Sequence, residues 1–245
     1  MAGNAINTRV LMGGYRLSSQ TNSITISTTA ATQDVTAFED TGKQYIVLPP
    51  ESSIEINGYL TANADDTGTW EKMATDALTT ADTIARVFSE SSTFTGQPAD
   101  VLPGATTTNL QLNFPVAGVM TISGTFNSST GLRHGICVYS GTVSATGETT
   151  PVDIGAAGSA GGVAYLFVTT ETGTGTSAEI DIESATTSGG TYASEGTFTF
   201  SGIGVVAVAL SGTVNRHLRI NVTDLGGATS WFVTCIACVS GVTYN

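Results

Sequence analysis

The chain has 245 residues, of which 40% are hydrophobic and only 11% are charged, and its formal net charge is −12. Eight basic residues against twenty acidic ones argue against a protein that reads nucleic acid, and three cysteines are too few for a disulfide scaffold. No apolar run approaches the roughly 20 residues of a membrane-spanning helix, and residues 1–9 lack the basic and apolar regions of a signal peptide.

Strands dominate the predicted structure of the N-terminal half. The chain holds 42 Thr and 23 Ser, and Thr, Val and Ile favour pleated, half-buried surfaces. Apolar and polar residues alternate with a period of two, which marks strands that bury one face. Such strands are predicted at residues 23–27, 53–60, 84–88, 109–114 and 119–126.

One segment has a helical period instead. Its apolar positions are Trp70, Met73, Ala74, Ala77 and Leu78. This spacing of three and four residues gives a helix one apolar face. We therefore expect a helix over residues 69–79, with Trp70, Met73 and Leu78 lying on a sheet.

A glycine-rich stretch at residues 140–162 separates the two halves, and we place a domain boundary after residue 157, giving domains 1–157 and 158–245. Six further strands at 162–170, 178–184, 196–200, 205–210, 217–223 and 230–239 predict a small antiparallel β-sandwich. The first of them is apolar enough to be covered on both faces. Gly226 and Gly227 predict a hairpin that pairs residues 219–224 with 230–235.

Residues that could support catalysis or bind a metal are sparse. His134 and His217 have no second ligand at metal spacing, and both fit ordinary surface or edge positions. Cys235 and Cys238 lie on one predicted strand, where residues three apart point to opposite faces. We interpret them, and Cys137, as core thiols.

Acidic residues offer two further candidates. Glu179, Asp181 and Glu183 share one face of a predicted strand, so they could bind Ca²⁺ or form a solvated face. Asp65 and Asp66 lack the spacing of a calcium loop and fit the turn before the helix. We therefore predict no catalytic, cofactor-binding or metal-binding residue, no cofactor, and a protein that is not an enzyme.

The order of several weak motifs resembles the major tail (tail tube) proteins of long-tailed bacteriophages. These motifs are an S-x-x-x-N start at 18–22, D-V-T-x-F at 34–38, I-x-x-x-G-Y at 54–59, the helix, a G-x-x-A turn at 96–99 and a long strand at 118–126. Residues 163–168, 183–192 and 215–220 resemble an Ig-like add-on domain of phage virion proteins.

The resemblance implies an all-β protein with one short helix, in which a split β-barrel is followed by a small antiparallel β-sandwich. It implies six copies in a ring, with sheets paired edge to edge, and rings stacked into a tube. The tube would conduct genomic DNA without sequence-specific binding, contact other tail or head proteins but no membrane, and assemble in the host cytoplasm. Segments 1–14 and 42–51 would become ordered only on assembly, as contacts between rings.

Two other functions stay open. A capsid decoration or head-associated virion protein could use the same β modules. A carbohydrate-binding adhesive module needs exposed aromatic residues, for which Tyr165, Tyr192 and Trp231 are available, although Tyr165 and Trp231 lie in apolar runs typical of a core. The acidic residues could line a lumen or simply maintain solubility.

Overall fold

The computed structural model describes residues 8–18, 21–30, 32–37, 41–47, 51–59, 73, 82–89, 93–116 and 118–244. Within these ranges the elements are β-strands that pair antiparallel with their neighbours. The all-β prediction is confirmed. No helix among the described residues is long and apolar enough to cross a membrane.

The predicted helix at 69–79 lies outside the described residues except at Met73, which has helical backbone geometry and is fully buried. Its Sδ atom lies 3.3 Å from the place where a Cβ on Gly124 would stand. Gly124 belongs to strand β9 (Thr121–Ser128). Met73 therefore packs on the face of β9 that carries Ile122 and Phe126, as expected for a residue on the apolar face of the predicted helix.

The chain divides into two compact units, which we describe separately. The first unit comprises Met1–Ser19, Thr83–Val101 and Arg133–Asn245, and the second comprises Gln20–Asp82 and Leu102–Leu132. This division groups residues 133–157 with the C-terminal strands, so it differs from a cut after residue 157. That cut stays a prediction about which parts of the chain fold independently.

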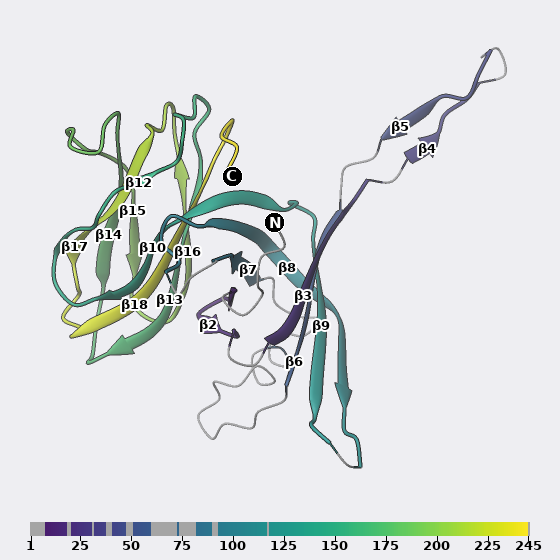
Figure 1. Cartoon of the computed structure of the whole chain (residues 1–245), viewed down its shortest axis with the longest axis horizontal. Coiled ribbons are helices and arrows are strands. Elements are labelled where there is room, and N and C mark those ends of the chain that lie inside the picture. Colours follow the sequence, from purple (N-terminus) through teal and green to yellow (C-terminus); the bar gives the residue numbers. More distant parts are fainter. Residues whose placement is uncertain are drawn as a thin grey trace. The chain divides into compact units, whose positions relative to one another are not determined.

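The first unit contains two sheets (Figure 1). The strands of the larger sheet, in spatial order, are β16 (Gly204–Leu210), β13 (Gly162–Thr172), β18 (Ser230–Val239), β10 (Arg133–Val143), the start of β8 (Pro98–Asn113), β7 (Asp82–Val87), β1 (Arg9–Met12) and β2 (Tyr15–Arg16). The smaller sheet orders β11 (Gly147–Glu148), β17 (His217–Asp224), β14 (Ala178–Ala185) and β15 (Ala193–Phe200), and β12 (Val152–Asp153) also pairs with β17.

One hydrophobic core lies between these two sheets. Leu166 of β13 and Trp231 of β18 meet Ile180 of β14 and Ile220 of β17 in a single cluster of buried residues. The predicted antiparallel sandwich is therefore present, and it also includes β10, β11 and β12.

The larger sheet is covered on its second face as well. Tyr165 and Phe167 of β13 join Leu11 of β1 and Val101 of β8 in a separate buried cluster. The prediction that the strand at 162–170 is covered on both faces is therefore confirmed. Residues 9–12 form the buried strand β1 in a single copy of the chain, so our expectation that this part of segment 1–14 becomes ordered only on assembly is wrong.

The hairpin predicted across Gly226 and Gly227 is also wrong. β17 pairs with β14 in the smaller sheet, whereas β18 pairs with β10 and β13 in the larger one. β18 is buried on both faces along most of its length, so it needs a central place in a sheet covered twice. The connection crosses between the two layers of the sandwich instead of turning back within one.

The second unit is built on a four-stranded antiparallel sheet (Figure 1). Its spatial order is β3 (Thr21–Thr29), β6 (Glu51–Tyr59), β9 and the end of β8. A two-stranded hairpin of β4 (Thr32–Asp34) and β5 (Tyr45–Val47) connects β3 to β6. Among the described strands this sheet is open, because its pairings end at β3 and β8 and do not close a barrel.

Candidate functional site

The sheet of the second unit has one apolar face and one polar face. On β6, Ile54 and Ile56 are fully buried, whereas Glu55 and Asn57 lie on the opposite face. This follows from the alternation in its sequence, since successive strand residues point to opposite faces. The register places the polar residues in cross-strand rows: Ser27, Ser53, Asn127 and Thr106; Thr25, Glu55, Thr125 and Asn109; Ser23, Asn57, Ser123 and Gln111.

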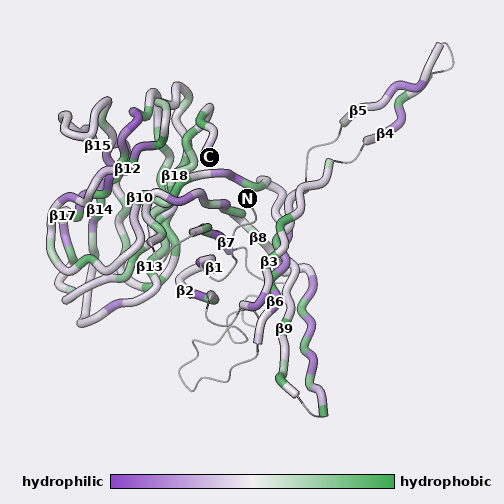
Figure 2. The backbone as a smooth tube through the Cα atoms, in the orientation of Figure 1, coloured by the Kyte–Doolittle hydropathy of each residue, from purple (hydrophilic) through white to green (hydrophobic). Residues whose placement is uncertain are grey.

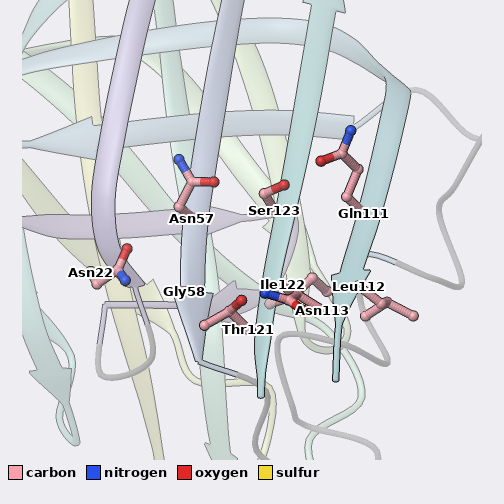
Figure 3. Close-up of a pocket in the computed structure, with 9 residues that line it drawn as sticks. All are labelled: Asn22, Asn57, Gly58, Gln111, Leu112, Asn113, Thr121, Ile122 and Ser123. Carbon is pink, nitrogen blue, oxygen red and sulfur yellow. The ribbon is translucent and has the colours of Figure 1, made fainter. Parts of the chain in front are cut away.

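A shallow pocket of about 470 Å³ lies at one end of this polar face. It is lined by Asn22, Asn57, Gly58, Gln111, Leu112, Asn113, Thr121, Ile122 and Ser123, and Figure 3 shows Asn57, Ser123 and Gln111 on neighbouring strands. The Nδ2 of Asn57 donates a hydrogen bond to Oε1 of Glu55 at 3.0 Å. The lining residues are uncharged, so the pocket offers amides and hydroxyls but no ion-pair partner.

Both edges of this sheet have little of the usual protection against pairing with another strand. Among the described strands, β3 pairs only with β6, and residues 106–113 of β8 pair only with β9. Neither edge segment contains a lysine, an arginine or a proline. Natural edge strands use such residues, bulges or coverage to prevent intermolecular pairing. Each edge has one register shift, between Thr21 and Ser23 in β3 and between Thr107 and Asn109 in β8. Beyond these shifts, residues 23–29 and 109–113 are regular and competent to pair with further strands.

The β4–β5 hairpin, which we call the arm, is almost entirely exposed. Gln33 is in register with Ile46 and Asp34 with Tyr45, and the N–H of Val35 donates to the carbonyl oxygen of Gln44 at 2.9 Å. The exposed fractions of Val35, Tyr45 and Ile46 are 43%, 54% and 47%. Part of segment 42–51, expected to become ordered on assembly, is thus already paired, but it buries little of its apolar surface.

The histidines considered from the sequence lie in ordinary positions. His134 is the second residue of β10 and is exposed. Its Nδ1 lies 2.6 Å from Oδ1 of the buried Asp100. Asp100 also forms an ion pair with Arg86, whose guanidinium lies 3.7 Å from the ring centroid of Phe88. His217 begins β17 and is half-buried. The structure therefore does not bring the two imidazoles together in one site.

All three cysteines are buried and unpaired. Cys235 belongs to the core between the two sheets and Cys238 to the cluster on the other face of the larger sheet, as the strand spacing predicts. Burial raises the pKa of Cys137 and of Cys238 to about 12, because the thiolate is poorly solvated there. These thiols are therefore held in their protonated form at neutral pH.

The three acidic residues of β14 do not form one site. Glu179 is exposed and Asp181 accepts a hydrogen bond from Thr197 at 2.5 Å. Glu183 is buried and pairs with Nε of Arg219 at 2.7 Å. A register shift between Ile182 and Glu183 separates it from the regular alternation.

Arg219 is the centre of a polar cluster on the outer face of the smaller sheet. Besides Glu183 it binds both carboxylate oxygens of Glu148, at 2.5 and 2.6 Å, and its guanidinium lies 3.8 Å from the ring centroid of Tyr192. Asp65 and Asp66 lie outside the described residues. Across the described ranges, no group of three or more His, Cys, Asp or Glu residues is placed to hold a metal ion.

The aromatic residues considered for carbohydrate binding are poorly placed for it. Tyr165 is 3% exposed and Trp231 is fully buried, as their apolar surroundings in the sequence indicate. Tyr192 is occupied by the guanidinium of Arg219.

No protein-family model and no curated protein matches this chain. A chain of the virion of a native gene transfer agent particle aligns with 16% identity and a TM-score of 0.39, over 54% of this chain and 98% of that chain. A chain of the tail of an empty gene transfer agent particle, refined with C6 symmetry, aligns with 18% identity and a TM-score of 0.34, over 46% and 80%. The Dit protein of phage SPP1, described as part of a hub adsorption apparatus, aligns with 12% identity and a TM-score of 0.33, over 93% and 98%. These solved structures come from tails, virions and hubs, and the low scores describe partial similarity of fold.

Proposed function

We propose that this chain is a structural, non-enzymatic protein of a bacteriophage tail, and that its copies form the tail tube by joining the open edges of the second unit's sheet. The observation that carries the proposal is that this sheet ends in two long edges, β3 and residues 106–113 of β8, neither of which contains a lysine, an arginine or a proline, and that residues 23–29 and 109–113 of these edges are regular strand. The motif order described above supports the same family.

The strand directions support a ring. β3, β6, β9 and β8 alternate in direction, so the two edge strands run opposite to each other. The β8 edge of one copy can therefore pair antiparallel with the β3 edge of the next, and the alternation continues across the joint. Such a contact uses two different surfaces, and heterologous contacts of this kind close into rings or extend into filaments. The resemblance implies that six copies close the ring.

The polar face of the same sheet supports a DNA conduit. This face carries hydroxyl and amide side chains with two carboxylates, Glu55 and, in register with Thr29 at the end of the sheet, Glu51, and the four strand segments contain no lysine or arginine. Binding to the DNA backbone depends on cationic side chains that neutralise phosphates. A lumen lined by this face would therefore let a duplex pass without holding it. Other proteins of the tail would be further partners.

Charge substitutions at the two edges test the proposal. Ser23 and Thr25 on β3, and Asn109 and Gln111 on β8, lie on the polar face in two of the rows. One variant replaces all four by lysine, so that like charges meet at every joint. The matched variant keeps lysine at 23 and 25 but places glutamate at 109 and 111, so that opposite charges meet there.

We expect rings or tubes of the wild-type chain in electron micrographs, compact single copies of the all-lysine variant, and recovery of rings in the lysine–glutamate variant. Sedimentation measures the same difference in solution. A wild-type chain that stays monomeric, alone and with the other components of its particle, contradicts the proposal. Equal assembly of the two variants shows that other surfaces make the joint.

A further inference from the structure

One margin of the larger sheet in the first unit is a long, regular and uncharged strand. β16 pairs only with β13 among the described strands, and its register is unbroken over residues 204–210, which we call the β16 edge. The sequence contains no charged residue between Glu195 and Arg216. Residues 205–210 are all hydrophobic on the scale that colours Figure 2. Such an edge presents unpaired backbone N–H and C=O groups to any strand that approaches it.

The other margins of the two sheets in this unit are protected in the ways that natural edge strands use. β2, at the opposite margin of the larger sheet, has two residues and carries the exposed Arg16. β11 and β12 also have two residues each. β15, at the margin of the smaller sheet, contains Glu195 at a register shift between Ser194 and Gly196. Short strands, charges and bulges all hinder pairing with another chain, and β16 has none of these features.

The side chains of the β16 edge are small and only partly covered. Val206 and Val208 pack against the core between the two sheets, and Val205 packs against the buried cluster on the other face of the larger sheet. Ala207 and Ala209 lie on the same face as Val205 and are exposed. The second face of the larger sheet, which is buried at the centre of β13, is therefore open to a further apolar surface at this margin.

The order of side chains makes the β16 edge complementary to itself. In an antiparallel pair of two β16 strands centred on Ala207, Val205 of each copy lies opposite Ala209 of the other, and Val206 lies opposite Val208. Side chains that are directly opposite share one face of a sheet and contact each other. On the exposed face each valine therefore meets a small alanine, and the two Ala207 residues lie between these pairs.

We propose that the β16 edges of two copies pair antiparallel about a two-fold axis at Ala207, so that their larger sheets become one continuous sheet. A second copy fits this edge because the chain has a net charge of −12, and the uncharged stretch places no like charges in the contact. A two-fold pair uses the same surface on both copies and is closed. The joined sheet then ends on each side at the short, charged margin of β2.

The inference does not rest on the proposed function. Neighbouring copies in a tube point the same way and are related by rotation about one axis and translation along it, so a two-fold contact does not join them. The β16 pair therefore joins copies outside a tube. One strand from each copy is a small contact beside stable interfaces of about 1,200–2,000 Å². We expect the copies to separate at the dilution used for micrographs and to pair at about 0.1 mM and above.

A cysteine at the proposed axis tests the contact in the full chain. Ala207→Cys places two thiols opposite each other, with Cα atoms about 4.5–5.5 Å apart, a separation that a disulfide spans. Mild oxidation at about 0.1 mM protein should give a disulfide-linked dimer and no larger product on non-reducing gels. The native thiols at 137, 235 and 238 are buried and do not compete.

Ala209→Cys is the matched control. Ala209 is also an exposed alanine on the same face of β16, but in the proposed register the two copies of residue 209 are about 13 Å apart along the strands. The dimer yield should be at least about fivefold lower than for Ala207→Cys. An equimolar mixture of Ala209→Cys and Val205→Cys should restore it. Equal yields from Ala207→Cys and Ala209→Cys, or no dimer from Ala207→Cys, overturn the inference.

Charge substitutions give a second readout that does not depend on disulfide geometry. Ala207→Lys and Ala207→Glu each place two like charges at the axis, so each should weaken self-association by about tenfold or more. An equimolar mixture of the two should associate again, because lysine then faces glutamate. Sedimentation equilibrium measures the association, and the all-lysine substitutions at 23, 25, 109 and 111 serve as the background that prevents ring formation.

The two contacts fail separately because they use different residues. A chain that stays monomeric in this background up to about 1 mM, or an association that Ala207→Lys leaves unchanged, overturns the β16 pair. Rings of the wild-type chain in micrographs keep the proposed function in either case. A β16 dimer without rings of the wild-type chain contradicts the proposed function and keeps this inference.

Discussion

The indole of Trp231 meets the ring of Phe200 edge to face, with ring centroids 5.2 Å apart and an interplanar angle of 80°. This contact joins the two sheets of the first unit, since Trp231 lies on β18 and Phe200 on β15. The Nε1 of Trp231 also donates a hydrogen bond to the carbonyl oxygen of Leu225 at 3.0 Å, in the connection between the layers. One side chain thus fixes both the core and the crossing of the chain over it.

Trp231→Ala should destabilise the first unit by about 3–5 kcal/mol, because it opens a large cavity in a fully buried site and leaves the Leu225 carbonyl without its donor. Urea unfolding followed by circular dichroism measures the loss. Thr199→Ala, at an exposed position of β15, is the control and should change the free energy of unfolding by less than about 0.5 kcal/mol. A cost for Trp231→Ala no greater than that of the control contradicts the assigned packing.

The ion pair between Asp100 and Arg86 gives a second prediction. Their side chains are only 10% and 16% exposed, so removal of the carboxylate leaves a poorly solvated guanidinium. Asp100→Leu should destabilise the protein by an amount toward the lower end of about 3–5 kcal/mol, because both groups keep some solvent.

His134→Gln is the matched control for this pair. The imidazole also contacts Asp100, but its side chain is 72% exposed. We expect a change of at most about 1 kcal/mol. If the two variants unfold at the same urea concentration, the buried Arg86 is not the group that makes Asp100 important.

Alanine substitutions at two glycines distinguish the energetic cost of backbone strain from that of steric contact. Gly161 and Gly212 have φ values of +66° and +71°, a region that side chains rarely adopt. A Cβ on Gly161 would lie 2.1 Å from the carbonyl oxygen of Leu210, whereas nothing lies within 4 Å of a Cβ on Gly212. Gly212→Ala should therefore cost about 1–2 kcal/mol, and Gly161→Ala distinctly more. Thermal unfolding of the two variants measures the difference, and equal melting temperatures contradict the close approach.

The sequence predicted strands well because alternation reports a local property, namely that one face of a strand is buried. The strands predicted at 23–27 and 53–60 correspond to β3 and β6, and the polar face of the second unit could be anticipated from the same pattern. Alternation does not report which strands are neighbours. For this reason neither the open edges nor the cross-strand rows of the site could be located before the pairings were known.

The failed hairpin shows the same limit. Gly226 and Gly227 have positive φ values, as a tight turn requires, but a Cβ on Gly226 would lie 2.3 Å from the carbonyl oxygen of Ser177. The glycine is needed there for close approach to another segment, which turn rules do not consider. The stronger signal was the burial pattern: the strand at 230–239 is apolar on both faces, and the strand at 217–223 on only one.

Thiol accessibility tests the burial of the cysteines. Burial raises the pKa of Cys137 and Cys238 to about 12, and the thiolate is the form that reacts. At pH 8 the native chain should therefore react with a chromogenic disulfide reagent only on the time scale of unfolding, and three thiols should react at once in denaturant. Thr199→Cys adds an exposed thiol and should give one immediate equivalent. An immediate equivalent from the wild-type chain contradicts the burial.

Acid should weaken the fold in part through Asp153. Hydrogen bonds from Arg216, at 2.7 Å from both Nε and Nη2, and from the N–H of Gly155, at 2.8 Å, lower the pKa of Asp153 in the folded state. The unfolded chain then binds more protons in the window between the folded pKa and the ordinary value of about 4. The stabilisation is therefore present above pH ~4 and is lost as the pH falls further.

Asp153→Asn removes this proton linkage. The variant should be less stable than the wild-type chain at pH 6, and the gap between their urea midpoints should narrow steadily as the pH falls below about 4. Asp224→Asn serves as the control, since Asp224 accepts a hydrogen bond from the N–H of Gly226 but has no arginine partner among the described residues. If the gap between the urea midpoints of the wild-type chain and Asp153→Asn stays constant from pH 6 to pH 3, the Arg216 pair forms equally well with a neutral side chain.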